Sequence, residues 1–195
     1  MTEELKKEVR ILMFKLYPLR LSYATENLTK HTDMYSILTK FKVSEEFLRH
    51  YIQKGTISGT NWAPITCHQN LSEQFIIDFQ DNLDWMYVSI CQDLSESFMR
   101  RMKHKILWNY ASENQYMSPD FIIEFHDKIN YYCLIQNKRK DMKVLPDTLM
   151  YDLSLLINRS IFRQTFFKSG RITAARLREI EQKYMWHSRF DLLDL

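Results

Sequence analysis

Glycine and proline are scarce in this chain, which has only three glycines and four prolines among its 195 residues. Folds rich in β-structure need frequent turns, and turns draw on these two residue types, so their scarcity favours helices. Cysteine is scarce too, since the chain has only Cys67, Cys91 and Cys133. Their number is odd, and no two of them form a CxxC pair. This pattern is typical of reduced, buried thiols in a reducing compartment rather than of a disulfide framework.

Long apolar runs and a strong charge imbalance are also missing. The apolar stretch at residues 11–14 ends at Lys15 and is too short for a signal-peptide core or a membrane span. The net charge is only +3, from 27 basic and 24 acidic residues, which is too weak to indicate nucleic-acid binding by itself. A hydrophobic content of 45% supplies a packed core and excludes disorder. We therefore expect a cytoplasmic globular protein without membrane contact.

What the sequence does contain is an internal repeat of 23 residues. The motif Leu-Ser-Glu-x-Phe-Ile begins at Leu71, and variants of it begin at Leu94 and Met117. An aromatic residue follows each start by 14 positions, and these aromatics are Trp85, Trp108 and Tyr131. Such self-similarity at a fixed period is the signature of a repeat protein in which neighbouring copies bury each other's apolar faces.

A less regular copy lies upstream of these three. It begins at Val43 and carries five extra residues before its aromatic position. The insertion contains Gly55 and Gly59, two of the three glycines, and is expected to be a surface loop. In this copy Gln69 is the counterpart of Gln92. The upstream segment therefore belongs to the same array.

Each copy is predicted to form two short helices. A serine near the start precedes acidic or proline residues, as an N-cap does, and these serines are Ser44, Ser72, Ser95 and Ser118. The second helix is expected to begin near Asp84, or near Asn130 in the later copy, and to bury Trp85 together with Val88.

The chain is therefore predicted to be all-α, a short solenoid of stacked two-helix repeats with N- and C-terminal capping helices. Residues 1–42 are expected to form the N-terminal capping helices, including one over residues 2–17. Residues 167–195 are expected to form the C-terminal capping helix, over residues 174–186. The repeat array spans residues 43–166, with copies starting near residues 43, 71, 94, 117 and 144.

The repeated motif, with its later Asp-Trp pair and Val-Ser pair, resembles short tandem repeats in proteins of unknown function from large DNA viruses and bacteriophages. The resemblance covers residues 43 to about 139 and implies a viral or phage source and a stacked-helix architecture. It brings no catalytic residues with it. The copy that starts at Leu94 departs from the pattern by carrying four basic residues: Arg100, Arg101, Lys103 and Lys105.

No catalytic, cofactor-binding or metal-binding set emerges from the sequence. Cys67 and His68 are adjacent, and neighbours on a helix point about 100° apart, so they do not readily share a metal. The glycine-containing loop lacks the Lys-Ser/Thr of a phosphate-binding loop. The carboxylates are expected on solvated helix faces or at helix ends rather than in a pocket, and they are Asp78, Asp81 and Asp84, and Glu124 with Asp127. We therefore predict that the chain is not an enzyme.

Two groups of side chains make up the candidate partner-binding surface. Tyrosines of the second helices form one group if they point outward, and they are Tyr87, Tyr110 and Tyr132. The basic residues Arg100, Arg101, Lys103 and Lys105 form the other. Aromatic rows near cations can anchor a protein partner or stack nucleic-acid bases. Burial of the tyrosines between copies is the competing interpretation.

The favoured function is a non-enzymatic protein-binding or structural module, a viral or phage component or effector that docks on another host or viral protein. Its location would then be the host cytoplasm or the virus particle. The alternative is a nucleic-acid-binding helical-repeat protein that uses the basic and aromatic surface, with binding that weakens steeply as salt increases. Self-association stays open as well.

Overall fold

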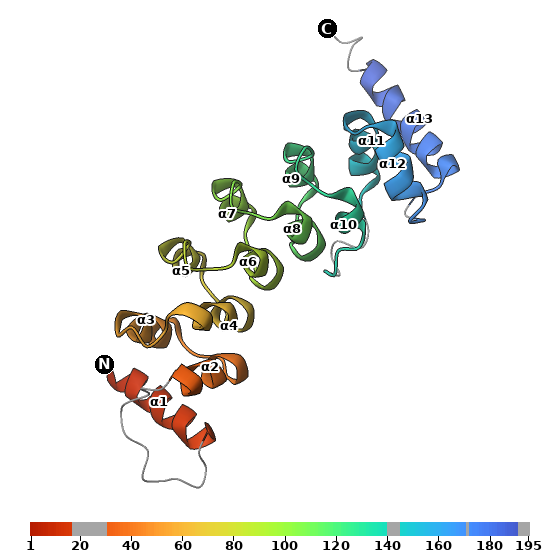
Figure 1. The fold of residues 1–195 in the computed structure, drawn as a ribbon. Coiled ribbons are helices and arrows are strands. Elements are labelled where there is room, and N and C mark those ends of the chain that lie inside the picture. Colours follow the sequence, from red (N-terminus) through yellow and green to blue (C-terminus); the bar gives the residue numbers. More distant parts are fainter. Residues whose placement is uncertain (17–30, 140–144, 171, 191–195) are drawn as a thin grey trace. The chain divides into compact units, whose positions relative to one another are not determined.

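The computed structural model describes residues 1–16, 31–139, 145–170 and 172–190. Over these ranges the chain forms thirteen α-helices and no β-strand, which confirms the predicted all-α class (Figure 1). The chain divides into two compact units, Met1–Gln92 and Asp93–Leu195. None of the helices in the described ranges is both long and apolar enough to cross a membrane.

The first unit contains α1 (Glu3–Leu16), α2 (His31–Lys40), α3 (Glu45–Gln53), the 3-10 turn η2 (Gly59–Asn61), α4 (Trp62–His68), α5 (Glu73–Asp78) and α6 (Trp85–Cys91). Helix α1 confirms the helix predicted at the N-terminus, and it buries Leu5, Val9 and Leu12. Helix α4 lies at the centre of a layer, because it packs against α2 on one side and α6 on the other.

The second unit contains α7 (Glu96–Arg101), α8 (Trp108–Asn114), α9 (Pro119–Glu124), α10 (Tyr131–Ile135), α11 (Asp147–Leu156), α12 (Arg159–Phe162), the π-helical segment η4 (Arg163–Phe167) and α13 (Ala174–Phe190). Helix α10 packs against α8, and α11 packs against both α9 and α13. The predicted copy start at Val144 lies outside the described residues. Thr173 caps α13, because its Oγ1 accepts from the backbone N–H of Arg176 at 3.1 Å.

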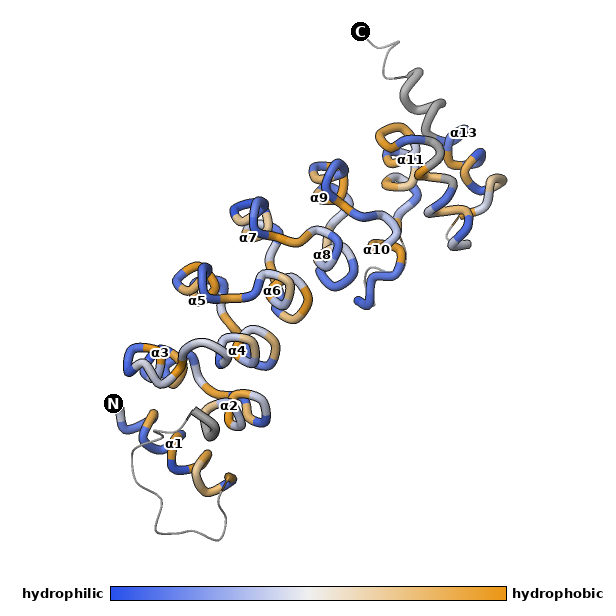
Figure 2. The backbone as a smooth tube through the Cα atoms, in the orientation of Figure 1, coloured by the Kyte–Doolittle hydropathy of each residue, from blue (hydrophilic) through white to orange (hydrophobic). Residues whose placement is uncertain are grey.

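The serine before the first helix of each regular copy is its N-cap, as predicted. The serine hydroxyl accepts from the backbone N–H three residues on, at 3.1 or 3.2 Å. The four pairs are Ser44 with Phe47, Ser72 with Phe75, Ser95 with Phe98, and Ser118 with Phe121. All four phenylalanines are buried. Figure 2 shows how hydrophobic and hydrophilic residues alternate around these short helices, which explains why one side of each turns inward.

The tryptophan that opens the second helix α6 is less buried than the sequence predicted. Trp85 is only half-buried, whereas Val88 on the same helix is completely buried. The indole Nε1 of Trp85 donates to the backbone carbonyl five residues earlier, at 2.9 Å. The indole Nε1 of Trp108 also donates to the carbonyl five residues earlier, at 3.1 Å, and so does the Tyr131 hydroxyl, at 2.9 Å. The two tryptophans lie at the edge of the core, with the polar end of each indole held by the turn between the two helices, whereas Tyr131 is buried.

A buried side-chain amide joins each second helix to the segment before it. In the first unit, Nε2 of Gln69 donates to the backbone carbonyls of Leu38 and Phe41 at 2.7 and 2.8 Å, while its Oε1 accepts from Val43 N at 2.9 Å. Gln92 repeats this arrangement 23 residues on, with donor contacts of 2.8 Å and an acceptor contact of 2.9 Å. The amide thus pairs backbone groups that the short helices leave without partners.

The second unit contains the same kind of buried side-chain amide, with asparagine in place of glutamine at one position. Oε1 of Gln115 accepts from the backbone N–H of Leu94 at 3.1 Å. At the next position Asn137 replaces glutamine, and its Nδ2 donates to the carbonyls of Ser112 and Gln115 at 2.7 and 2.9 Å. The side-chain amides of these copies are all buried.

Acidic residues of one copy reach the N-cap serine of the next. Oε1 of Glu45 accepts from Ser72 N and its Oε2 accepts from Ser72 Oγ, at 2.5 and 3.0 Å. Oε1 of Glu96 accepts from Ser118 N at 2.6 Å. These carboxylates were expected only to favour the positive ends of their own helices. They also connect successive copies.

The insertion in the upstream copy is a loop, as predicted. Gly55 and Gly59 adopt positive φ angles of 72° and 52°, a backbone conformation that favours glycine. Between them Ile57 is buried, so the loop is anchored to the core of the first unit.

We expect Gln69→Leu to lower the free energy of unfolding of the first unit by about 2–4 kcal/mol, because backbone groups of Leu38, Phe41 and Val43 lose their partner. Urea unfolding followed by circular dichroism measures the change. Gln53→Leu is the matched control, since Gln53 is exposed. Equal stability of the two variants would show that the amide contributes nothing.

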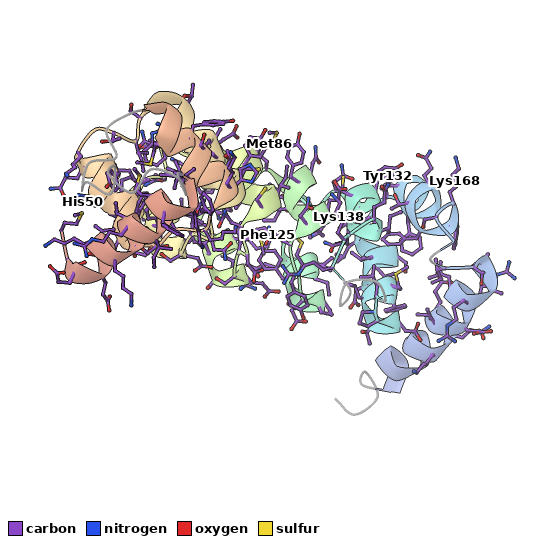
Figure 3. All side chains as sticks on the ribbon, turned by 90° about the horizontal axis from the view of Figure 1, so that it is seen from below. His50, Met86, Phe125, Tyr132, Lys138 and Lys168 are labelled. Carbon is purple, nitrogen blue, oxygen red and sulfur yellow. The ribbon has the colours of Figure 1, made fainter. Side chains whose placement is uncertain are left out.

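His50 gives the first unit a pH-dependent stability. Its ring meets Tyr51 edge-on at 5.1 Å between centroids, and His50 is labelled in Figure 3. Burial lowers the pKa of His50 below its usual value; Lys54 and the N-terminal ammonium add to the effect, and Glu46 opposes it. The folded state therefore binds this proton less tightly than the unfolded state, so stability is lost as the pH falls below about 6.5.

We expect the urea concentration at the unfolding midpoint of the wild-type protein to decrease when the pH is lowered from 7 to 5. The midpoint of His50→Gln should decrease less over the same pH interval. The exposed His68→Gln variant, which should keep the wild-type pH profile, is the control. Identical slopes for His50→Gln and wild type would contradict the assignment.

Candidate partner-binding groove

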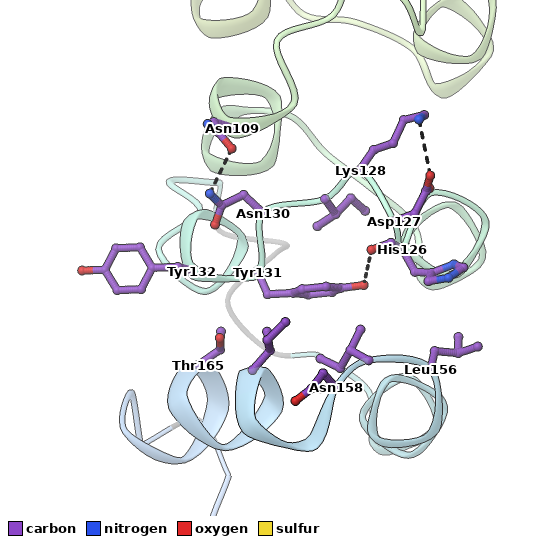
Figure 4. Close-up of a pocket in the computed structure, with 13 residues that line it drawn as sticks. Asn109, His126, Asp127, Lys128, Asn130, Tyr131, Tyr132, Leu156, Asn158 and Thr165 are labelled. Atoms are coloured by element: carbon purple, nitrogen blue, oxygen red, sulfur yellow. Dashed lines mark hydrogen bonds and ion pairs between the residues drawn. The ribbon is translucent and has the colours of Figure 1, made fainter.

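An open groove of about 570 Å³ lies in the second unit, between α10 and the α11–α12 segment (Figure 4). Apolar side chains supply much of its lining, among them Ile129, Leu156 and Ile161. Leu156 is 45% exposed and Ile161 is 51% exposed, although both are aliphatic. The groove is therefore a place where hydrophobic surface meets solvent.

Polar groups at the upper wall of the groove are fixed by hydrogen bonds. Asn130 caps α10, because its Oδ1 accepts from Cys133 N at 3.1 Å, and its Nδ2 donates to Asn109 Oδ1 at 2.9 Å (Figure 4). The Tyr131 hydroxyl donates to the carbonyl of His126. These contacts hold the wall in one arrangement before any partner arrives.

Charge in the groove is close to balanced. Asp127 and Lys128 form an ion pair at 3.4 Å. Burial raises the pKa of Tyr131, and Asp127 adds to the shift, so the phenol stays neutral. The groove therefore offers apolar surface with neutral hydrogen-bonding groups rather than a field of one sign.

Tyr132 projects from α10 in the opposite direction from Tyr131, as Figure 4 shows. The Tyr132 side chain is 66% exposed, whereas the nearby aromatic residue Phe125 is buried. Both residues are labelled in Figure 3. Tyr131 opens α10 as Trp108 opens α8, so Tyr132 is the second helical residue whereas Tyr110 is the third. Tyr132 and Tyr110 are thus about 100° apart in helical position.

The remaining candidate tyrosines are distributed between the units. Tyr87 is half-buried on α6 of the first unit. Tyr110 is 37% exposed on α8 of the second unit. Tyr132 alone among the three lines the groove.

Arg100, one of the basic candidates, is engaged within the second unit. Its Nε lies 2.7 Å from Glu124 Oε2, and its guanidinium covers the Phe121 ring at 4.9 Å. In the first unit Arg49 occupies the same place in its copy: it pairs with Asp78 at 2.7 Å and covers a phenylalanine ring of the following copy at 5.0 Å. Asp78, which was expected to be solvated, is therefore a partner of Arg49.

The other basic candidates lie near the end of α7. Arg101 and Lys103 are exposed, and Lys105 is half-buried. The Lys103 backbone carbonyl accepts from Trp108. Of the seven candidates in the predicted surface, Tyr132 is the one that the groove includes.

Several groove residues were missed by sequence reasoning. Leu156 and Ile161 belong to the degenerate last copy, where the repeat pattern gives no register. Asn109 and Asn130 stand at positions where the copies differ from one another. The structure leaves Leu155 and Leu156 exposed at the end of α11, whereas an amphipathic helix usually turns such residues inward.

The cysteines also differ from expectation. Cys91 is exposed, and Cys67 and Cys133 are half-buried, so the prediction of buried thiols is wrong. Among the described residues, no three histidine, cysteine or acidic side chains lie close enough together to hold a metal ion.

No protein-family model, curated protein or solved structure matches this chain.

We expect Arg100→Ala to lower the free energy of unfolding by about 1 kcal/mol, because the ring contact and the ion pair are both lost. The matched control Arg101→Ala should change it by less than ~0.5 kcal/mol. Urea unfolding of both variants measures this. If the control costs as much as Arg100→Ala, the Arg100 contacts do not stabilise the second unit.

Proposed function

We propose that this chain is a non-enzymatic helical-repeat protein that binds an extended or helical segment of another protein in the groove beside α10. The observation that carries the proposal is one open groove lined by the exposed aliphatic residues Leu156 and Ile161, with the exposed Tyr132 at its edge. Exposed apolar surface of this kind, bordered by polar groups, is characteristic of protein-interaction sites.

We further propose that the helix pairs stack as a short solenoid, with α1 and α13 as its caps. The support is the recurrence of the same three contacts in both units. A side-chain amide pairs backbone groups at Gln69 and at Asn137, an acid reaches the next N-cap at Glu45 and at Glu96, and an arginine covers the next phenylalanine. Helical solenoids offer extended, chemically unreactive surfaces that suit partner binding.

The composition of the groove indicates the kind of partner. Its paired charges and neutral amides favour a segment with large apolar side chains over a strongly charged one. Tyr132 supplies a large side chain with few rotatable bonds, the residue type that most often anchors protein interfaces. A role as a viral or phage component or effector rests on the resemblance of the repeat motif alone.

The test is affinity capture from cells with the full chain as bait, comparing groove variants with matched surface controls. We expect Ile161→Asp and Tyr132→Ala to reduce recovery of the captured partner at least tenfold, because a charge or a cavity then occupies the apolar contact. Ile11→Asp and Tyr35→Ala are the controls, since these residues are 46% and 49% exposed in the first unit. Equal recovery with groove and control variants would refute the groove as the binding site.

A direct titration distinguishes nucleic-acid binding from protein binding. Fluorescence anisotropy with labelled single- and double-stranded DNA and RNA at low salt should show no saturable binding. Saturable binding that weakens with salt and is lost in Arg101→Ala/Lys103→Ala would favour nucleic acid instead.

A further inference from the structure

We infer that Cys67 and Cys91 form a reversible disulfide that links α4 to α6 when the chain meets a low-molecular-weight disulfide. The two residues are 24 positions apart in sequence, on consecutive second helices of the first unit, and their sulfur atoms lie 3.5 Å apart. The proposal is independent of the partner-binding groove, which lies in the second unit.

The geometry brings the two sulfurs close to bonding distance. Helices α4 and α6 pack directly against each other, so the thiols are held together by the fold rather than by chance encounters. A disulfide has an S–S distance of about 2.05 Å, so the sulfurs must approach by about 1.5 Å. Rotation of two cysteine side chains about χ1, with a small shift of the helices, can supply an approach of this size.

Access to Cys91 suits the reaction, and one nearby charge assists it. Cys91 is exposed at the last position of α6, where a small oxidant can reach it, and Cys67 is half-buried behind it. Lys42 lies nearby, with its Nζ donating to the His68 carbonyl and to Asn70 Oδ1 at 3.0 Å. Its positive charge favours the thiolate of Cys91.

The reaction is two successive thiol–disulfide exchanges. The thiolate of one cysteine attacks a sulfur of the small disulfide, forms a mixed disulfide and releases one small thiolate. The second cysteine, as thiolate, then attacks the protein sulfur of that mixed disulfide and releases the second small thiolate. The two cysteines lose two electrons, the small disulfide gains them, and the two thiol protons end on the two small thiols.

The exchange should be slow at neutral pH and accelerate as the pH rises. The residue Cys91 is exposed, but its sulfur lies against Cys67. Burial of this kind raises the pKa of the Cys91 thiol to about 11; the neighbouring Cys67 adds to the shift and Lys42 opposes it. The thiolate fraction below that pKa grows about tenfold for each pH unit. Once formed, the bond closes a 24-residue separation and restricts the unfolded chain.

The experiment incubates the full chain with excess oxidised glutathione at pH 8.5, blocks remaining thiols with a maleimide and measures the intact mass. Trypsin does not separate the pair, because no lysine or arginine lies between Lys54 and Arg100. The disulfide therefore appears as a loss of two hydrogens from one tryptic peptide. A protease that cleaves at acidic residues then yields two peptides that a reducing agent separates.

We expect wild type and the control Cys133→Ser to form the linked peptide with no glutathione on it. Cys67→Ser and Cys91→Ser should instead retain a mixed disulfide with glutathione. The oxidised wild type should melt roughly 5–10 °C higher than the reduced protein, and reduction should reverse the shift.

Three outcomes would overturn the inference. Wild type could carry glutathione on both cysteines without linking them, or it could link either one to Cys133 or to a second chain. The third is that Cys67 and Cys91 both stay as free thiols under conditions where Cys133 in the same molecule is fully glutathionylated. Thermal melting of each reduced variant shows whether a serine substitution has disturbed the fold.

Discussion

A helix of six or seven residues pairs few of its own backbone groups, because the first four N–H groups and the last four carbonyls of any helix have no partner within it. Helices α5 to α10 have five to seven residues each, so most of their backbone polar groups depend on something outside the helix. Serine hydroxyls serve the N-termini, and the buried amides of Gln69, Gln92 and Asn137 serve the C-termini. The fold depends on this pairing, since buried polar groups without partners would offset the gain from burying the phenylalanines.

Some of these partners come from the neighbouring copy. Glu45 holds the N-cap of the copy that follows, and Arg49 covers a phenylalanine of that copy. Glu96 and Arg100 repeat both contacts in the second unit. A single pair of helices would therefore lack both its hydrophobic cover and its hydrogen-bond partners, which gives the repeated sequence a physical reason.

The groove occurs where this pattern changes. Beyond α10 the chain continues into the longer α11 and the irregular α12–η4 segment instead of another pair of six- and seven-residue helices. The end of α11 and the start of α12 then leave Leu156 and Ile161 exposed opposite α10. The phenylalanines of the short helices are buried, whereas Leu156 and Ile161 at this change of pattern are exposed.

Local patterns in the sequence predicted the helices, the serine caps and the glycine loop, because each depends on residues a few positions apart. The half-burial of Trp85, the pairing of Arg100 with Glu124 and the approach of Cys67 to Cys91 were decided by contacts across 20 residues or more, or by the turn that holds the indole. The sequence marked Tyr132 as a candidate but gave it the wrong neighbours, since a one-residue difference in helix register turns a side chain by about 100°. Only the tertiary structure places Tyr132, Leu156 and Ile161 in the lining of one groove, because the last copy has no periodicity that predicts which of its faces lies opposite α10.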